Sequence, residues 1–88
     1  MDPVQIRFYT RKGCHLCKTA LTVLQELQKE FKFRVRLVDI DASPHLLGVY
    51  GQDVPVGEME GREIFRHRVD KHAMREILRE RFKNRRPA

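Results

Sequence analysis

The sequence predicts an α/β domain in which one mixed sheet of four strands is flanked by three helices. Short segments alternate apolar and polar residues, as half-buried strands do, and between them apolar residues recur every three or four positions, as on one helical face. These segments follow in the order strand, helix, strand, helix, strand, strand, helix. Because 88 residues leave room for a single domain, all of them should share one small core.

The first strand is expected over residues 4–8, where Val4, Ile6 and Phe8 alternate with polar residues. A polar loop follows, and a helix should begin at or near Cys14. The buried face of this helix is expected to consist of Leu16, Ala20, Val23, Leu24, Leu27 and Phe31. A second strand is expected over about residues 33–39. Strand, helix and strand form a parallel crossover, which brings the carboxyl ends of both strands to the same edge of the sheet.

The second helix should be short, because Ser43 can cap it, Pro44 suits its first position and Gly51 can stop it. Val54 begins a third strand, and a turn at residues 60–61 leads into a fourth over residues 62–65, which makes an antiparallel hairpin. Asp70 can cap the last helix. The buried stripe of that helix is expected to be Ala73, Met74, Ile77, Leu78 and Phe82. The domain should span residues 1–82, followed by a basic, frayed tail of residues 83–88.

Charge is distributed unevenly along the chain. The net charge is +6, and residues 62–88 contain 10 basic and 4 acidic side chains, whereas residues 1–61 contain 8 of each. Neither a membrane span nor a signal peptide is recognisable, so we expect a protein of the cytoplasm with no membrane partner. We also expect it to be a monomer.

Cys14 and Cys17 are too few and too close together for the disulfide framework of a small secreted domain. A zinc site would need further ligands, and neither a second Cys-x-x-Cys nor a histidine pair occurs, so no metal site is expected. The other histidines outside the motif are scattered along the chain: His45, His67 and His72. A lone Cys-x-x-Cys between a strand and a helix is typical of a redox pair.

Thiol–disulfide exchange needs a thiolate, and the positive end of a helix favours one. Cys14 falls at this position, with Lys12 and Arg11 adding positive potential nearby. Cys17 lies at the i+3 position, on the same side of the helix, so it can attack the mixed disulfide that Cys14 forms. We therefore expect Cys14 to be the nucleophile and Cys17 the resolving thiol.

The motif Cys14-His15-Leu16-Cys17 after the first strand, with Val54-Pro55 opening the third, resembles the glutaredoxin and thioredoxin superfamily over about residues 4–82. The resemblance implies a thioredoxin-like fold with sheet order 2-1-3-4, strand 3 being antiparallel. It also implies a glutaredoxin-like thiol–disulfide oxidoreductase that acts on a protein or small-molecule disulfide. In such proteins the two residues between the cysteines tune the redox potential, which gives His15 and Leu16 that role; for His15 an exposed position without a role is an equal alternative.

The same resemblance implies that the Val54–Pro55 peptide bond is cis and that these residues form a shelf for an extended substrate. It gives Arg11 the role of gripping a glutathione carboxylate, although a solvated surface arginine is an equal alternative. Glutaredoxins have a Gly-Gly pair after the fourth strand, whereas this chain has residues 66–70 with the sequence RHRVD. No tightly bound cofactor is expected, and glutathione stays an open alternative.

Three further alternatives concern other residues. If the third strand is regular, Glu58 shares a face with Val54 and Val56; a bulge at Gly57 is favoured over a carboxylate buried near the site. A second alternative is an iron–sulfur carrier in which Cys14 of two subunits and two external thiols, such as those of glutathione, hold a shared cluster, as some proteins similar to glutaredoxins do. Finally, a basic module could bind nucleic acid or an acidic protein, but a solvated helix face is favoured and a nucleic-acid partner is not expected. Its residues would be Arg75, Arg79, Arg81, Lys83, Arg85 and Arg86.

Overall fold

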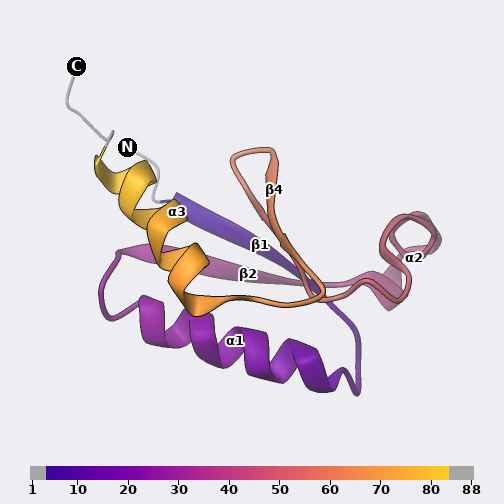
Figure 1. The fold of residues 1–88 in the computed structure, drawn as a ribbon. Coiled ribbons are helices and arrows are strands. Elements are labelled where there is room, and N and C mark those ends of the chain that lie inside the picture. Colours follow the sequence, from indigo (N-terminus) through magenta and orange to yellow (C-terminus); the bar gives the residue numbers. More distant parts are fainter. Residues whose placement is uncertain (1–3, 84–88) are drawn as a thin grey trace.

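The computed structural model describes residues 4–83 and has the element order that the sequence predicts (Figure 1). The strands are β1 (Val4–Thr10), β2 (Phe33–Asp39), β3 (Val56–Met59) and β4 (Arg62–Arg66). The helices are α1 (His15–Leu27), α2 (Pro44–Tyr50) and α3 (Lys71–Lys83), and a 3₁₀ turn, η1 (Ile40–Ala42), precedes α2. None of the helices in this part of the chain is long and apolar enough to cross a membrane.

The sheet has the strand order β2-β1-β3-β4, as expected from the resemblance to thioredoxin-like proteins. β1 and β2 are parallel, in a register that runs from Val4 beside Phe33 to Thr10 beside Asp39. β3 is antiparallel to both β1 and β4. The carboxyl ends of β1 and β2 therefore lie at the same edge, and the loop that carries Cys14 leaves the sheet there.

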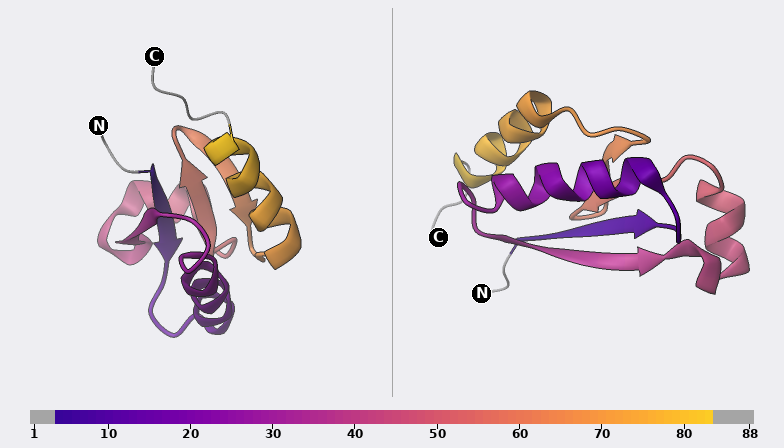
Figure 2. Two further views of the ribbon diagram at one scale, coloured as in Figure 1. Left: turned by 90° about the vertical axis from the view of Figure 1, so that its left-hand side faces the viewer. Right: turned by 90° about the horizontal axis from the view of Figure 1, so that it is seen from below.

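The core lies between the sheet and two helices, α1 and α3, which cover the same face (Figure 2). Alternation along β1 directs Ile6 and Phe8 to this face, where both are buried. The helices contribute the buried side chains of Ala20, Leu24, Leu27, Met74 and Leu78. These are five of the residues that helical spacing predicts for the buried stripes, whereas the prediction for Ala73 is wrong, because this residue of α3 is exposed.

The opposite face of the sheet, called the open face below, carries the alternate residues of each strand. Of the described helices only α2 lies against it, at the end where β1 finishes, and there the ring of Tyr50 stacks on that of Tyr9 with 4.4 Å between centroids. α2 is one two-turn helix of seven residues, too short to follow the strands along their length. Arg7 and Arg36 are neighbours in the register, and none of the described helices covers the part of the open face that includes them.

The β3–β4 hairpin contains a bulge near Gly57, but the sequence prediction that the bulge lies on the third strand is wrong. The register shifts between Gly57, which is paired with Phe65, and Glu58, which is paired with Glu63, so the extra residue is Ile64 on β4. The bulge leaves the alternation of β3 against β1 unchanged. Glu58 therefore stays on the same face as Val56.

Candidate active site

Cys14 and Cys17 lie at the junction of the β1–α1 loop and α1, and they form a disulfide with their Cα atoms 5.2 Å apart. Cys14 is the N-cap residue of α1, with extended backbone angles of φ −80° and ψ 110°. Cys17 lies in the first turn of that helix. The Cys-x-x-Cys spacing thus places one sulfur just before the helix and the other one turn inside it, as the sequence predicts.

The helix terminus is built to accept negative charge at Cys14. The backbone N–H of Cys17 donates a hydrogen bond to Cys14 Sγ at 3.1 Å, where a Ser or Asp side chain would normally accept it. The first turn of α1 contains no acidic residue, so no carboxylate competes for the N–H groups. A thiolate at Cys14 would lie against the positive end of α1.

The two sulfurs differ in access. Cys17 is only 5% exposed and belongs to the core cluster, whereas Cys14 is half-buried and packs against the edge of that cluster. A disulfide of another molecule can therefore reach Cys14, while Cys17 is shielded. This asymmetry matches the roles of nucleophile and resolving thiol.

Val54 and Pro55 precede β3, and the peptide bond between them is cis, in agreement with the resemblance. Both are buried, and Val54 belongs to the same core cluster as Cys17. The carbonyl of Pro55 accepts a hydrogen bond of 2.6 Å from the backbone N–H of His67. This hydrogen bond connects the segment after β4 to the cis-proline.

His67, one of the histidines outside the Cys-x-x-Cys motif, lies in the segment after β4. Its φ of 71° lies in the left-handed region, which a non-glycine residue adopts at a cost and which is common at functional sites. It occupies the segment where glutaredoxins have their Gly-Gly pair. Glycine adopts a positive φ without strain, so the Gly-Gly pair of glutaredoxins is the signal in the sequence that points to a left-handed backbone at His67.

Arg11 is engaged within the protein. Its Nη2 and Nε atoms lie 2.9 Å and 3.0 Å from Oδ1 of Asp41, which follows β2. A ligand carboxylate would have to compete with Asp41 for this guanidinium. Of the three residues expected to tune the pair, Lys12 and His15 are exposed and Leu16 is half-buried.

Glu58 lies on the open face, whereas α1 and its Cys17 lie on the other face of the sheet. The Glu58 carboxylate accepts a hydrogen bond of 3.3 Å from the Tyr9 hydroxyl and is 3.5 Å from an Arg7 nitrogen, with 28% of its side chain exposed. Tyr50 stacks on the ring of Tyr9. Burial raises the pKa of Tyr50, and so do the neighbouring Tyr9, Glu58 and Glu63. Glu58 is thus a half-buried, satisfied carboxylate remote from the cysteine pair.

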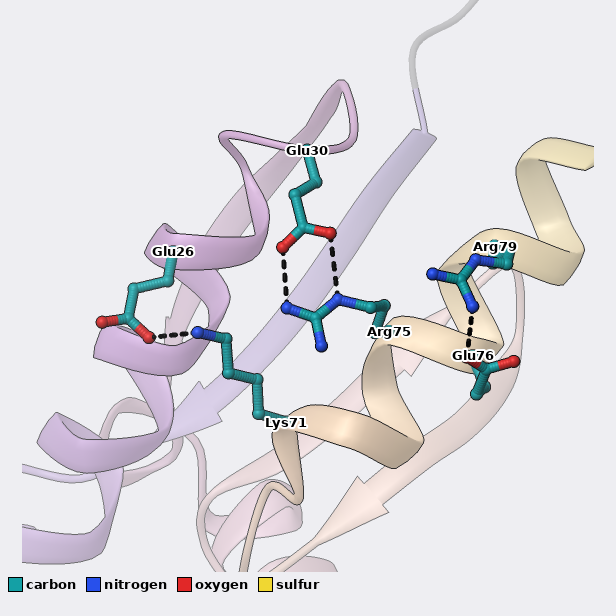
Figure 3. Close-up of polar contacts among 6 residues, drawn as sticks. All are labelled: Glu26, Glu30, Lys71, Arg75, Glu76 and Arg79. Atoms are coloured by element: carbon teal, nitrogen blue, oxygen red, sulfur yellow. Dashed lines mark hydrogen bonds and ion pairs between the residues drawn. The ribbon is translucent and has the colours of Figure 1, made fainter.

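The arginines of α3, which formed the less favoured alternative of a basic binding module, are paired with carboxylates in the described part of the helix. Arg75 makes two bonds of 2.9 Å and 2.8 Å to Glu30 near the end of α1, and Lys71 reaches Glu26 at 2.9 Å (Figure 3). Arg81 pairs with Glu60, and Arg79 with Glu76. The hydrogen bond from Arg75 holds the pKa of Glu30 below its usual value. Arg85 and Arg86 lie outside the described residues.

Within residues 4–83, no group of three or more His, Cys, Asp or Glu side chains is placed to hold a metal ion.

Comparison with known proteins gives consistent similarities. Residues 5–79 match the family model described as Glutaredoxin-like domain (DUF836). The chain is 32% identical over 90 residues to the Glutaredoxin-like protein YDR286C homolog of Dictyostelium discoideum, covering 91% of this chain and 83% of that protein. It is 33% identical over 88 residues to the uncharacterized protein Rv0508 of Mycobacterium tuberculosis, covering 93% and 91% of the two chains.

Solved structures show the same fold. The solution structure of protein Ne2328 from Nitrosomonas europaea superposes with a TM-score of 0.77 at 31% identity, covering 89% of this chain and 94% of that one. A mutant thioredoxin from Halobacterium salinarum superposes with a TM-score of 0.65 at 20% identity, covering 98% and 80%. The second similarity supports the fold alone.

Proposed function

This chain belongs to the family of the Glutaredoxin-like domain (DUF836), and we propose that it is a thiol–disulfide oxidoreductase in which Cys14 attacks and Cys17 resolves. The observation that carries the proposal is the position of Cys14 as the N-cap of α1, with its sulfur accepting the N–H of Cys17 and linked to the Cys17 sulfur. A thiolate formed there is favoured by the same N–H group and by the dipole of the helix.

In the first step the Cys14 thiolate attacks one sulfur of the substrate disulfide. A bond forms between Cys14 and that sulfur, the substrate S–S bond breaks, and the leaving sulfur departs as a thiolate that takes a proton from water. In the second step Cys17 loses its proton and attacks Cys14 Sγ, which expels the remaining substrate sulfur. The products are a reduced dithiol substrate and the Cys14–Cys17 disulfide of the structure.

The catalytic cycle closes when external thiols reduce the Cys14–Cys17 disulfide and are themselves oxidised. Two monothiols or one dithiol supply the two electrons. A reducing compartment such as the cytoplasm maintains thiols of this kind. The shielding of Cys17 supports this order of events, because the sulfur that a second molecule can reach is that of Cys14.

The segment around the cis peptide supports a place for the substrate. In the proposal the backbone at Val54 pairs with an extended stretch of substrate beside Cys14, and the His67 hydrogen bond to Pro55 holds this segment in position. Lys12, His15 and Leu16 adjust the stability of the thiolate. Glutathione is a candidate thiol, and its binding through Arg11 would require the contact with Asp41 to open.

The test is a trapping experiment with a fluorescent peptide disulfide as the substrate. Cys17→Ser should accumulate a mixed disulfide on Cys14, visible as a mass increase that a reducing agent removes, because no resolving thiol is present. Cys14→Ser is the matched control and should accumulate little, because its remaining sulfur is shielded. If neither variant captured the peptide while both retained wild-type exchange activity, the proposal would be wrong.

A further inference from the structure

Three arginines gather on the open face, away from the cysteine pair. Arg34 and Arg36 are on β2, and the parallel register places Arg36 directly beside Arg7 of β1. All three are exposed. Arg7 is ion-paired with Glu58 at 3.5 Å, whereas Arg34 and Arg36 have no ion pair within residues 4–83. Arg34 and Arg36 are called the β2 arginines below.

The β2 arginines differ in this respect from the arginines of α3. The latter meet carboxylates, so much of the charge of that helix is balanced locally (Figure 3). Like charges on neighbouring strands of one face repel each other and lower the stability of the free protein. A bound anionic group would relieve this repulsion.

β2 is also an edge strand. Among the described strands only β1 pairs with it, so within residues 4–83 no strand lies beside the main-chain N–H and C=O groups on its outer side. Leu37 of the same strand points to the other face and is 57% exposed. It is the more exposed of the two large hydrophobic side chains that are exposed among the described residues. The edge therefore offers main-chain hydrogen bonds, two free guanidinium groups on one face and an apolar side chain on the other.

We propose that the outer edge of β2 binds an extended acidic segment of a partner protein by strand addition. In an added strand, alternate side chains point to opposite faces. Glutamate or aspartate at every second position would then meet Arg34 and Arg36, and an apolar residue next to the one that faces Arg36 would cover Leu37. Main-chain bonds supply affinity in such a complex, and the alternating side chains supply specificity.

Two other occupants fit the observations less well. A second copy of this chain would bring Arg34 and Arg36 against their own counterparts, and like charges on an edge oppose such pairing. A nucleic acid has no main chain that could extend the sheet, and bases bind on aromatic side chains. The aromatic rings of this face, Tyr9 and Tyr50, are instead stacked on each other.

The position of this edge gives it a use in the proposed function, on which this step rests. β1 and β2 are parallel, so both lead to the end of the sheet from which the Cys14 loop departs (Figure 1). A segment held along β2 would keep the rest of its protein near Cys14. Tethering of this kind raises the effective concentration of a disulfide without adding contacts at the cysteines.

The experiment measures binding of a cysteine-free, fluorescein-labelled peptide of alternating glutamate and valine to the full chain by anisotropy. Binding is expected at about 20 mM salt and should weaken as the salt rises. Arg34→Glu with Arg36→Glu should weaken it by about tenfold or more, because the attraction becomes repulsion. Arg62→Glu with Lys83→Glu changes the net charge equally, away from the β2 arginines, and should weaken it about twofold or less. Circular dichroism confirms that both double variants are folded.

Two further ligands test the mode of binding. The same peptide with N-methyl groups on every second amide, made in both registers, should lose binding in one register, because only one set of amides faces the ladder. An oligothymidylate of equal charge should bind more weakly than the peptide. Equal loss in both double variants, equal binding of both methylated peptides, or tighter binding of the oligonucleotide would each overturn the proposal.

The docking site and the proposed function can fail separately. Arg34→Glu with Arg36→Glu should reduce a disulfide that lacks an acidic segment at the wild-type rate. If the wild-type protein reduced no disulfide, the proposed function would be wrong, whereas the peptide titration would still decide whether β2 binds acidic strands.

Discussion

Gly57 of β3 lies directly beside the Phe65 side chain of β4. The ring of Phe65 occupies the position that a Cβ atom at Gly57 would take. That ring in turn contacts Phe8, with 6.0 Å between the centroids. The absence of a side chain at Gly57 thus lets an aromatic pair pack above the middle of the sheet.

Gly57→Ala is expected to lower the free energy of unfolding by about 1–3 kcal/mol, because the new methyl group must displace the Phe65 ring. Gly48→Ala is a matched control in α2, where nothing lies within 4 Å of the added Cβ. It should stabilise the protein by about 0.5–1 kcal/mol, since alanine loses less backbone entropy in a helix than glycine does. Urea unfolding of the two variants gives both values. Equal effects of the same sign would contradict the role of the Phe65 ring.

Some site residues could be predicted from the sequence because their roles depend on local spacing. The position of Cys14 before α1 and that of Cys17 one turn later follow from the helical period alone. The partner of Arg11 could not be predicted, since Asp41 is 30 residues away and the contact depends on how β1 and β2 align. The same holds for the carboxylate of Glu58, whose partner Tyr9 is 49 residues away.

At the level of elements, α1 and α3 are held together by charge at the border of their apolar contact. Lys71 bonds to Glu26 and Arg75 bonds to Glu30, across 45 residues of sequence in each case (Figure 3). The hydrogen bonds from these cations hold the pKa of both carboxyl groups below the ordinary value of 4.5. Both helices are thus linked by pairs that require ionised glutamates.

This arrangement predicts an acid-sensitive contact between the two helices. A carboxyl group whose pKa is lower in the folded than in the unfolded protein stabilises the fold fully above pH 4.5, and this contribution is lost as the pH falls through the folded value. Glu26→Gln with Glu30→Gln should therefore lose less stability than the wild type between about pH 5 and about pH 2. Urea unfolding across this range measures the difference.

Glu76→Gln is the control for this titration, because the partner of Glu76, Arg79, is on the same helix. It removes a carboxylate without touching the contact between α1 and α3. Since exposed pairs contribute little individually, the informative quantity is the slope of stability with pH rather than its value at neutral pH. The same acid slope in the double variant as in the wild type would show that the two pairs do not contribute.

The order of the elements could be predicted because each has its own period, cap or turn. Ser43 accepts the N–H of Leu46 and Asp70 accepts that of Ala73, as expected for N-caps. The distribution of balanced and unbalanced charge could not be predicted. The excess of basic residues is at the C-terminal end of the sequence, yet the arginines without carboxylate partners include two on β2, because only the folded chain brings Glu30 and Glu60 to α3.

The molecule as a whole is elongated, with extents of 40 × 24 × 15 Å. β1 runs along its length from Val4 towards the Cys14 loop. α3 runs back in the opposite sense and ends at Lys83 (Figures 1 and 2). The first and last described residues therefore lie at one end and the cysteine pair at the other.

The protein can therefore be attached to a solid support near Lys83 while the end with Cys14 and Cys17 faces the solution. Immobilised on beads through a bioorthogonal group at position 83, the protein should keep at least about half of the disulfide-reduction rate that the same modified protein has in solution. Attached through position 12, beside Cys14, it should lose most of that rate, because the surface blocks approach to the sulfur. If the protein kept the same fraction of its rate when attached at position 83 and at position 12, the approach of disulfides past residue 12 would be contradicted.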